Sequence, residues 1–315
     1  MNSQSYGELP AFVRPGAALS EHLPLIVFPQ SAGPAALSST RAARVCIDRY
    51  LPRTGCMLFR AFGIDGPEHF VKWVDAFGFE PSDPVRSGTQ QALGLSSPSH
   101  SLLARSERRF ALQALRVNGH AQRPLLWLYC ATPRYALEES LIADHRELYR
   151  RLSLSIRTRF LSRGLLYRRT FASCGRYGWA EHFGTTDRAT IEASCRREGV
   201  SVRWTANGDC ALSWRCPALL SHPVTRENVC HNCLLSCLSD GAEPAPLGNQ
   251  PGLEVRYGDG SQITNAELEN VRAAFEASAS VIPLERGDVL LIDPLLIWHA
   301  QVPYLLDLMP AREDA

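Results

Sequence analysis

Apolar residues along the chain gather in short runs separated by turn residues. Continuous apolar runs that are bounded by Gly, Pro, Asp or Asn predict buried strands. Such runs lie at residues 55–63, 124–133, 289–292 and 295–298, and shorter strand-like runs lie at 200–204, 210–214 and 228–235. The pattern therefore predicts a strand-rich chain.

Helical segments between these runs are marked by their ends. A Ser, Thr or Asp followed three residues later by Glu predicts the start of a helix, and Gly is a common end. These signals predict a helix at residues 67–78 and another that starts at Asp144, with Glu147 as its capping partner. A further helix is predicted through SIRTRFLS (155–162) to Gly164. Two more are predicted at 185–199 and at 264–279, where Thr264 and Glu267 supply the cap.

Residues 1–45 are rich in Pro, Ser and Ala and are expected to form an irregular lead-in. Residues 46–315 are expected to form one domain, in which the turn-rich segments 80–109 and 239–252 are long lid loops. The strands and helices do not alternate regularly. This favours a mainly β, α+β fold with flanking helices, either a decorated β-sandwich or a jelly-roll barrel.

The overall charge favours no polyanionic partner. The chain has 33 basic and 32 acidic residues, a net charge of +1, and its arginines are scattered along the sequence. Such a balance indicates neither nucleic acid nor an anionic membrane as a partner. No segment reaches the roughly 18 apolar residues that a membrane span needs, and none resembles a signal peptide. We therefore expect a soluble, cytoplasmic protein whose ten cysteines are reduced.

His299 ends the apolar stretch DPLLIWH. It could be a core histidine with one backbone hydrogen bond, or a metal ligand held on a rigid strand, and nothing nearby in the sequence supplies further ligands. Both interpretations stay open on the sequence alone.

The stretch CHNCLLSC places Cys230, Cys233 and Cys237 close together. Three thiolates at this spacing could bind zinc or part of an iron–sulfur cluster. The stretch lacks the second C-x2-C pair of a zinc ribbon, and in a strand Cys230 would face away from the other two. Buried, inert thiols are the favoured interpretation, with zinc as an alternative. Nucleotide-binding and nucleophile-elbow motifs are absent from the sequence.

Six segments in order resemble one known family. They are GCMLFRAFGI (55–64), WLYCATP (127–133), EESLIADHRELYRRL (138–152), GWAEHFGTTDRATIEASCR (178–196), RYGDGSQITNAELENVRAAFE (256–276) and ERGDVLLIDPLLIWHAQVPY (285–304). Together they resemble the taurine dioxygenase (TauD/TfdA, clavaminate synthase-like) superfamily of Fe(II)/2-oxoglutarate oxygenases, in particular the aspartyl β-hydroxylase-like proteins of syringomycin-type peptide pathways. The resemblance implies a double-stranded β-helix (jelly-roll) core, an Fe(II) ion in a His-x-Asp/Glu…His triad, and 2-oxoglutarate as cosubstrate.

The resemblance implies roles for two residues of this chain. His299 falls on the distal iron-binding histidine, and Ser140 falls on the threonine that helps to hold 2-oxoglutarate. The His-x-Glu pair is expected within residues 108–124, where the matching positions are Gln113 and Leu115, or, one residue along, Ala114 and Arg116. The late arginine that binds 2-oxoglutarate has no match nearer than Arg312. No catalytic residue is assigned.

Two functions follow from the resemblance. The first is an oxygenase of natural-product (non-ribosomal peptide-type) biosynthesis that hydroxylates an amino acid or a carrier-bound aminoacyl group, with a small-molecule substrate and a carrier protein or peptide synthetase module as partners. The second is a catalytically inactive relative that serves as a binding or regulatory protein in such a pathway. The incomplete triad is the feature that separates the two functions, since an iron ion needs more than one imidazole.

Overall fold

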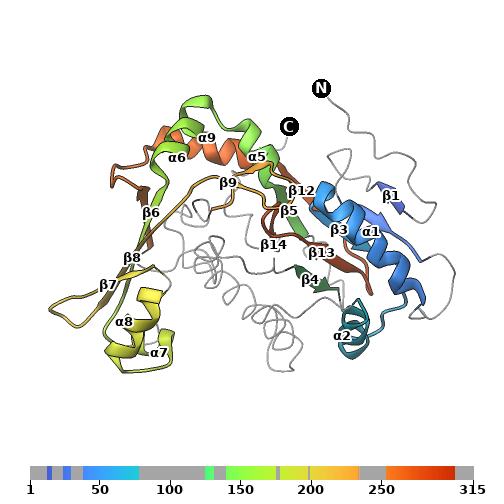
Figure 1. The fold of residues 1–315 in the computed structure, drawn as a ribbon, viewed down its shortest axis with the longest axis horizontal. Coiled ribbons are helices and arrows are strands. Elements are labelled where there is room, and N and C mark those ends of the chain that lie inside the picture. Colours follow the sequence, from blue (N-terminus) through green and yellow to red (C-terminus); the bar gives the residue numbers. More distant parts are fainter. Residues whose placement is uncertain are drawn as a thin grey trace, which may run out of the picture.

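A computed structural model describes residues 13–15, 24–29, 38–77, 125–130, 140–174, 178–197, 199–232, 234 and 253–301 (Figure 1). The largest sheet has the order β1-β2-β3-β13-β4, formed by Val13–Pro15, Leu25–Val27, Cys56–Phe59, Val289–Ile292 and Leu126–Tyr129. Its neighbours are antiparallel except for the parallel pair of β2 and β3. The sheet thus joins segments from both ends of the described chain.

The two faces of this sheet pack against different layers, because successive residues of a strand point to opposite sides. Met57, Phe59 and Leu291 share one apolar cluster with residues of helices α1 (Ser38–Thr54) and α2 (Pro67–Asp75). Leu58 and Leu290 belong to a second cluster on the other face. Helices therefore cover the outer face, and the inner face meets a second sheet.

That second sheet has the order β12-β5-β14 and consists of Ala279–Ile282, Ser140–Asp144 and Ile297–Gln301. Ile142, Ile282 and Ile297 join the same cluster as Leu58 and Leu290, so the inner faces of the two sheets pack together. On the outer face, the Trp298 ring lies edge-on to Phe275 of α9 at 4.8 Å. Helices α5 (His145–Arg151) and α9 (Asn265–Glu276) belong to this outer layer.

A third sheet has the order β11-β6-β8-β7, formed by Leu253–Tyr257, Leu165–Phe171, Cys210–Cys216 and Ser201–Trp204. One of its faces packs with helices α6, α7 and α8, which span Leu154–Arg163, Trp179–Phe183 and Arg188–Arg197. A short pair, β9 (Leu220–Ser221) and β10 (Asn228–Val229), lies in the connection that follows β8.

Two glycines allow a close backbone crossing where α6 gives way to β6. Gly164 has φ +63°, and a Cβ there would lie 2.8 Å from the Cys216 carbonyl oxygen. A Cβ on Gly258 would lie 2.0 Å from the Arg163 carbonyl oxygen, and its N–H donates to the Gly164 oxygen at 3.0 Å. Only glycine fits such contacts, and the predicted helix end at Gly164 is confirmed.

The predicted sheet-rich fold with helices is confirmed in outline, with four corrections. The lead-in is not irregular throughout, because β1, β2 and the start of α1 lie within residues 1–45. The run 228–235 is a strand only at Asn228–Val229, and the last strand begins at Ile297 rather than at 295. Asp144 does cap α5, but the Glu147 side chain pairs with Arg150 and Arg151 instead of completing a box.

Some expectations remain predictions. The lid loops 80–109 and 239–252 lie outside the described residues. The division into a lead-in and one domain also stays a prediction. Within the described part, none of the helices has the length and apolar character needed to cross a membrane.

Candidate functional site

His299 lies on the inner face of the β12-β5-β14 sheet. Its register partner on β5 is Ile142, and directly opposed residues of an antiparallel pair share a face. Ile142 packs in the cluster between the two sheets, and so does Ile297, which is two residues from His299. The imidazole is therefore held on the side of the sheet that faces β3 and β13.

The environment of the His299 ring is apolar. Its Nε2 atom is buried and has no hydrogen-bond partner among the described residues. Burial lowers the pKa of His299 to about 4, so the ring is neutral at pH 7. A neutral imidazole with an unused nitrogen is in the state required of a metal ligand, and it can equally bond to a polar group of a small molecule.

The described residues do not fit the three-ligand iron centre that the sequence resemblance implies. In the part of the chain that the structure describes, no three His, Cys, Asp or Glu side chains lie together as a metal site. His299 is thus one donor without two companions there. The segment expected to provide the other ligands, and the late arginine, lie outside the described residues: Gln113, Leu115, Ala114, Arg116 and Arg312.

Ser140 lies close to His299 in the backbone register. Ser140 is opposite Gln301, and Ile142 is opposite His299, so two positions along β5 separate Ser140 from the partner of His299. Positions two apart on a strand share a face. The structure therefore brings the two predicted site residues onto the same sheet, and the assigned role of Ser140 stays a prediction.

The predicted cysteine site gains no support. Cys230 is buried, burial raises the pKa of its thiol to about 12, and its Sγ accepts a hydrogen bond from Asn232 at 3.3 Å. Among the described residues, no cluster of three potential metal ligands includes Cys230. Cys233 and Cys237 lie outside the described residues. The zinc alternative is therefore unsupported, and Cys230 behaves as a buried small residue.

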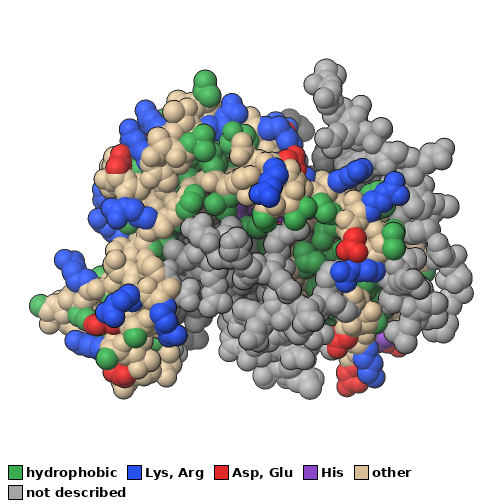
Figure 2. Space-filling model, viewed as in Figure 1, with side chains coloured by type: hydrophobic (Ala, Val, Ile, Leu, Met, Phe, Trp, Pro, Cys, Tyr) green, Lys and Arg blue, Asp and Glu red, His purple; other side chains and the backbone are tan. Residues whose placement is uncertain are grey.

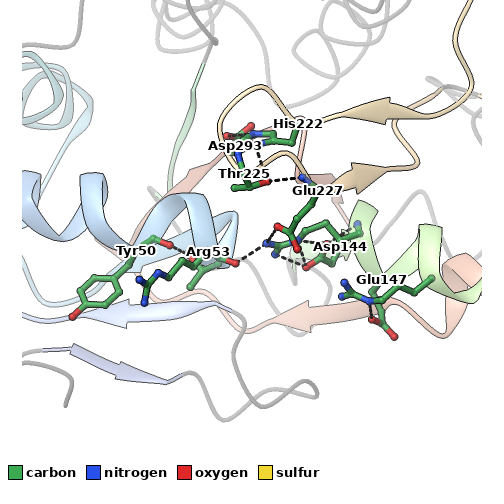
Figure 3. Close-up of polar contacts among 11 residues, drawn as sticks. Tyr50, Arg53, Asp144, Glu147, His222, Thr225, Glu227 and Asp293 are labelled. Atoms are coloured by element: carbon green, nitrogen blue, oxygen red, sulfur yellow. Dashed lines mark hydrogen bonds and ion pairs between the residues drawn. The ribbon is translucent and has the colours of Figure 1, made fainter. Parts of the chain in front are cut away.

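Buried side chains that the sequence analysis did not predict stabilise the turn between β13 and β14 (Figure 3). Asp293 ends the strand pairing of β13, and its carboxylate accepts from the Leu295 N–H and from His222 Nε2 at 3.2 Å. His222 Nδ1 accepts from the Thr225 N–H at 3.0 Å, which places the ring proton on Nε2. The side chains of His222 and Asp293 are 0% and 1% exposed, so this pair is shielded from solvent.

Two further histidines contact the same turn. His145 Nδ1 donates to the Leu295 carbonyl at 3.0 Å, and His231 has a backbone hydrogen bond to Pro294. Their rings meet edge to face at 5.0 Å. Burial lowers the pKa of His145, and burial together with the charge of His145 lowers the pKa of His231 to about 3. Both rings are therefore neutral at physiological pH.

An ion-pair network lies beside this turn. Arg146 of α5 contacts the Asp144 carboxylate at 2.6 Å and Glu227 at 3.2 Å, and it donates to the Arg53 carbonyl at the end of α1 at 2.7 Å. Burial opposes the charge of Arg146, but Asp144 and Glu227 more than offset it, and the pKa of Arg146 is raised. The network ties α1, α5 and the β9–β10 segment together (Figure 3).

Sequence reasoning missed these polar groups because they come from four separate parts of the chain. The one available signal was the Asp293-Pro294 dipeptide after an apolar run, which is typical of a turn with a structural carboxylate. His145, His222 and His231 stand among residues that gave no pattern. Their roles depend on distant contacts that a linear sequence does not display.

Comparison with known proteins identifies the family. The model of the family described as "Taurine catabolism dioxygenase TauD, TfdA family" matches residues 32–312. The chain belongs to this family. The superfamily resemblance seen in the six sequence segments is thereby confirmed.

Two known proteins align with most of the chain. Dapdiamide synthesis protein DdaC of Enterobacter agglomerans is 25% identical over 272 residues, which cover 82% of this chain and 81% of that protein. Clavaminate synthase-like protein At3g21360 of Arabidopsis thaliana is 24% identical over 316 residues, covering 90% and 91%.

Two solved structures also align along most of the chain. AAD-2 in complex with Mn(II) and N-oxalylglycine is 12% identical, with a TM-score of 0.43 over 91% of this chain and 89% of that one. A taurine dioxygenase from Burkholderia xenovorans is 13% identical, with a TM-score of 0.39 over 94% and 85%.

Proposed function

We propose that this member of the TauD, TfdA family is a binding protein of natural-product biosynthesis that uses the face around His299 to hold a small molecule without oxidising it. One observation carries the proposal. The described residues place no two further metal donors beside His299, and residues 108–124, RRFALQALRVNGHAQRP, contain no His-x-Asp or His-x-Glu. A ferrous ion held by one imidazole competes poorly with water, because even the loss of an outer partner weakens metal binding about 10–100-fold.

The neutral His299 ring supports the binding role. Its buried Nε2 is a polar atom in an apolar layer without a partner among the described residues, and such an atom costs stability until something bonds to it. A ligand with a hydroxyl, amide or carboxyl group would satisfy it. In this proposal the two packed sheets are the sides of the family's double-stranded β-helix, and the ligand lies between them.

The biosynthetic context rests on the relatives. The name of DdaC assigns that protein to dapdiamide synthesis. An amino acid or carrier-bound aminoacyl group is accordingly the proposed ligand, and a carrier protein or peptide synthetase module is the proposed partner. Both would be present in the cytoplasm, the proposed location.

The second candidate function is the family's own reaction, hydroxylation that depends on Fe(II) and 2-oxoglutarate. Family membership and the neutral His299 imidazole favour it. It requires two more metal donors and a group that pairs with the cosubstrate's carboxylate. The described part of the chain holds no cluster of three metal donors, so no reaction step is derived.

Anaerobic titration with Fe(II) and 2-oxoglutarate separates the two functions. The binding role predicts no visible charge-transfer band, no retained iron and no succinate after oxygen is admitted. One equivalent of bound iron with turnover of 2-oxoglutarate would refute it. Native mass spectrometry against amino acids and 2-oxo acids then tests for a ligand, which His299→Leu should abolish.

A gain-of-function variant tests the lost ligand positions directly. Gln113→His with Leu115→Glu restores the family's donor types at the matching positions and should create iron binding that depends on His299. Ala114→His with Arg116→Glu is the matched control in the shifted register. Binding by the control pair alone would show that the shifted alignment is the correct one.

A further inference from the structure

The third sheet has one face rich in arginine. Arg168 of β6, Arg203 of β7, Arg215 of β8 and Arg256 of β11 have the parity opposite to that of the residues packed in the core. These four residues, called the arginine face below, are far apart in the sequence and gathered by strand pairing. The scattered arginines of the sequence thus become a surface feature only in the fold.

The register sets the spacing of the arginine face. Arg256 and Arg215 both pair with Leu166, one from each side, and Arg168 lies two positions further along β6. Arg203 pairs with Ala211, and Arg168 pairs with Ser213. Along the strands, the position of Arg168 therefore lies between those of Arg203 and Arg215. With strands about 4.8 Å apart and residues about 3.4 Å apart along them, the backbone positions of the four arginines fit within roughly 14 by 14 Å.

The arginine face has an unbalanced charge and is open to solvent. Glu254 is the one acidic residue of that parity within these four strands, so four positive charges and one negative charge leave +3. The side chains of Arg168 and Glu254 are 51% and 44% exposed, and Arg203 and Arg215 are also exposed. Arg203 makes no ion pair within the described chain, whereas Arg168 and Arg256 share Glu254. Figure 2 shows basic side chains, with some acidic ones among them, over the end of the molecule formed by α6, β6 and α8.

We propose that the arginine face docks an acidic protein partner, through a helix or loop whose Asp and Glu carboxylates span about 14 Å. Arginine suits this contact because its planar guanidinium pairs with carboxylates in a two-pronged geometry. Charge complementarity of this kind speeds association and selects partners.

Nucleic acid fits the arginine face less well. The aromatic residues of this sheet, among them Tyr167, Trp204 and Trp214, lie on the opposite, packed face, so the arginine face offers bases nothing to stack on. The whole chain carries a net charge of only +1, which supplies no long-range attraction to a polyanion. The proposal is independent of the ligand at His299, because the arginine face is on another sheet.

Fluorescence anisotropy of the full-length chain tests the docking surface. The probe is a labelled helical peptide with glutamates spaced four residues apart, and its glutamine analogue is the control. Binding should require the glutamates and weaken as salt is raised. The variant Arg168→Gln, Arg203→Gln, Arg215→Gln should raise Kd about 10-fold or more, as expected when several surface ion pairs are lost together.

A second triple variant tests whether binding depends on the position of the arginines or only on the net charge of the protein. Arg49→Gln, Arg196→Gln, Arg197→Gln removes the same charge from exposed helix positions and should change Kd less than about 2-fold. Equal weakening by both variants, or no binding of the glutamate peptide, would refute the docking surface. A different outcome is that a single-stranded or duplex oligonucleotide binds more tightly than the peptide and loses affinity only for the first variant. That result would refute the protein partner and show that the arginine face binds nucleic acid. Matching melting temperatures and circular dichroism of the two variants establish that both are folded.

Discussion

At the scale of single residues, the buried histidines differ in what surrounds their ring nitrogens. Both nitrogens of His222 are bonded, one to the Asp293 carboxylate and the other to Thr225. The Nε2 of His299 has no partner within the described chain. The first ring therefore serves the fold, and the second is the one available for a ligand.

Leucine substitutions should separate these two roles. His222→Leu removes the imidazole donor from the buried Asp293 carboxylate and should lower the free energy of unfolding by about 3 kcal/mol. His299→Leu removes an unpaired buried nitrogen and should leave that free energy unchanged or raise it by up to about 1 kcal/mol. Urea denaturation of both variants measures the difference, and an equal loss in the two would contradict the assignment.

The histidines also make stability depend on pH. The folded-state pKa values of His145, His231 and His299 lie below the unfolded value near 6.5, so the unfolded chain binds more protons than the folded chain in mild acid. Stability should be complete above about pH 6.5 and decline as the pH falls toward 4, with each histidine contributing on the order of 1 kcal/mol per pH unit.

Melting temperatures between pH 7 and pH 4.5 test this dependence. His231→Gln should flatten the decline because it removes one of the three groups. Leu161→Gln, at an exposed position without a titratable group, should leave the slope unchanged. A wild-type stability that rises on acidification would contradict the neutral, buried state of these rings.

At the scale of elements, helix ends were predictable and their partners were not. Thr264 caps α9 with Glu267 in a complete box, as the spacing predicted. The Glu267 carboxylate also accepts from the Tyr257 hydroxyl at 2.8 Å and pairs with Arg159. The sequence spacing predicts the local cap, but the partners from β11 and α6 are determined by tertiary packing.

Thr264→Ala should therefore weaken α9 measurably. It removes the hydroxyl that bonds to the Glu267 N–H, and loss of such a cap costs about 1 kcal/mol. Thr264→Ser keeps the hydroxyl and should restore most of that loss. Chemical denaturation of the two variants checks the prediction, and equal stability of both would mean that the cap is unimportant.

At the scale of the whole molecule, strand patterns predicted the layers but not their pairing. The run at 289–292 is apolar at every position, as expected for a strand buried on both faces. Its neighbours, β3 and β4, could not be deduced, because a uniform apolar run carries no register signal. The sequence predicted a strand that ends at residue 298, whereas β14 runs Ile297–Gln301 with His299 at its centre. The pairing with β5 that extends this strand is a tertiary contact with no sequence signal.

The cluster shared by the two sheets should dominate stability. Leu290 is fully buried there, and Leu290→Ala should lower the free energy of unfolding by about 3 kcal/mol, since it leaves a cavity in a closely packed layer. Leu161→Ala, at a position that is 65% exposed, should change it by less than about 0.5 kcal/mol. Differential scanning calorimetry of both variants gives the comparison, and similar losses would contradict the packed-sheet core.

The central place of β13 has a consequence for biogenesis. This strand separates β3 from β4 and pairs with both, although some 230 positions divide Cys56–Phe59 from Val289–Ile292. During translation the earlier strands leave the ribosome long before the one that joins them. The backbone hydrogen-bonding groups of β3 and β4 on the side of β13 therefore stay unpaired in the nascent chain until β13 is synthesised. We expect slow folding and a need for chaperones as a result of this topology.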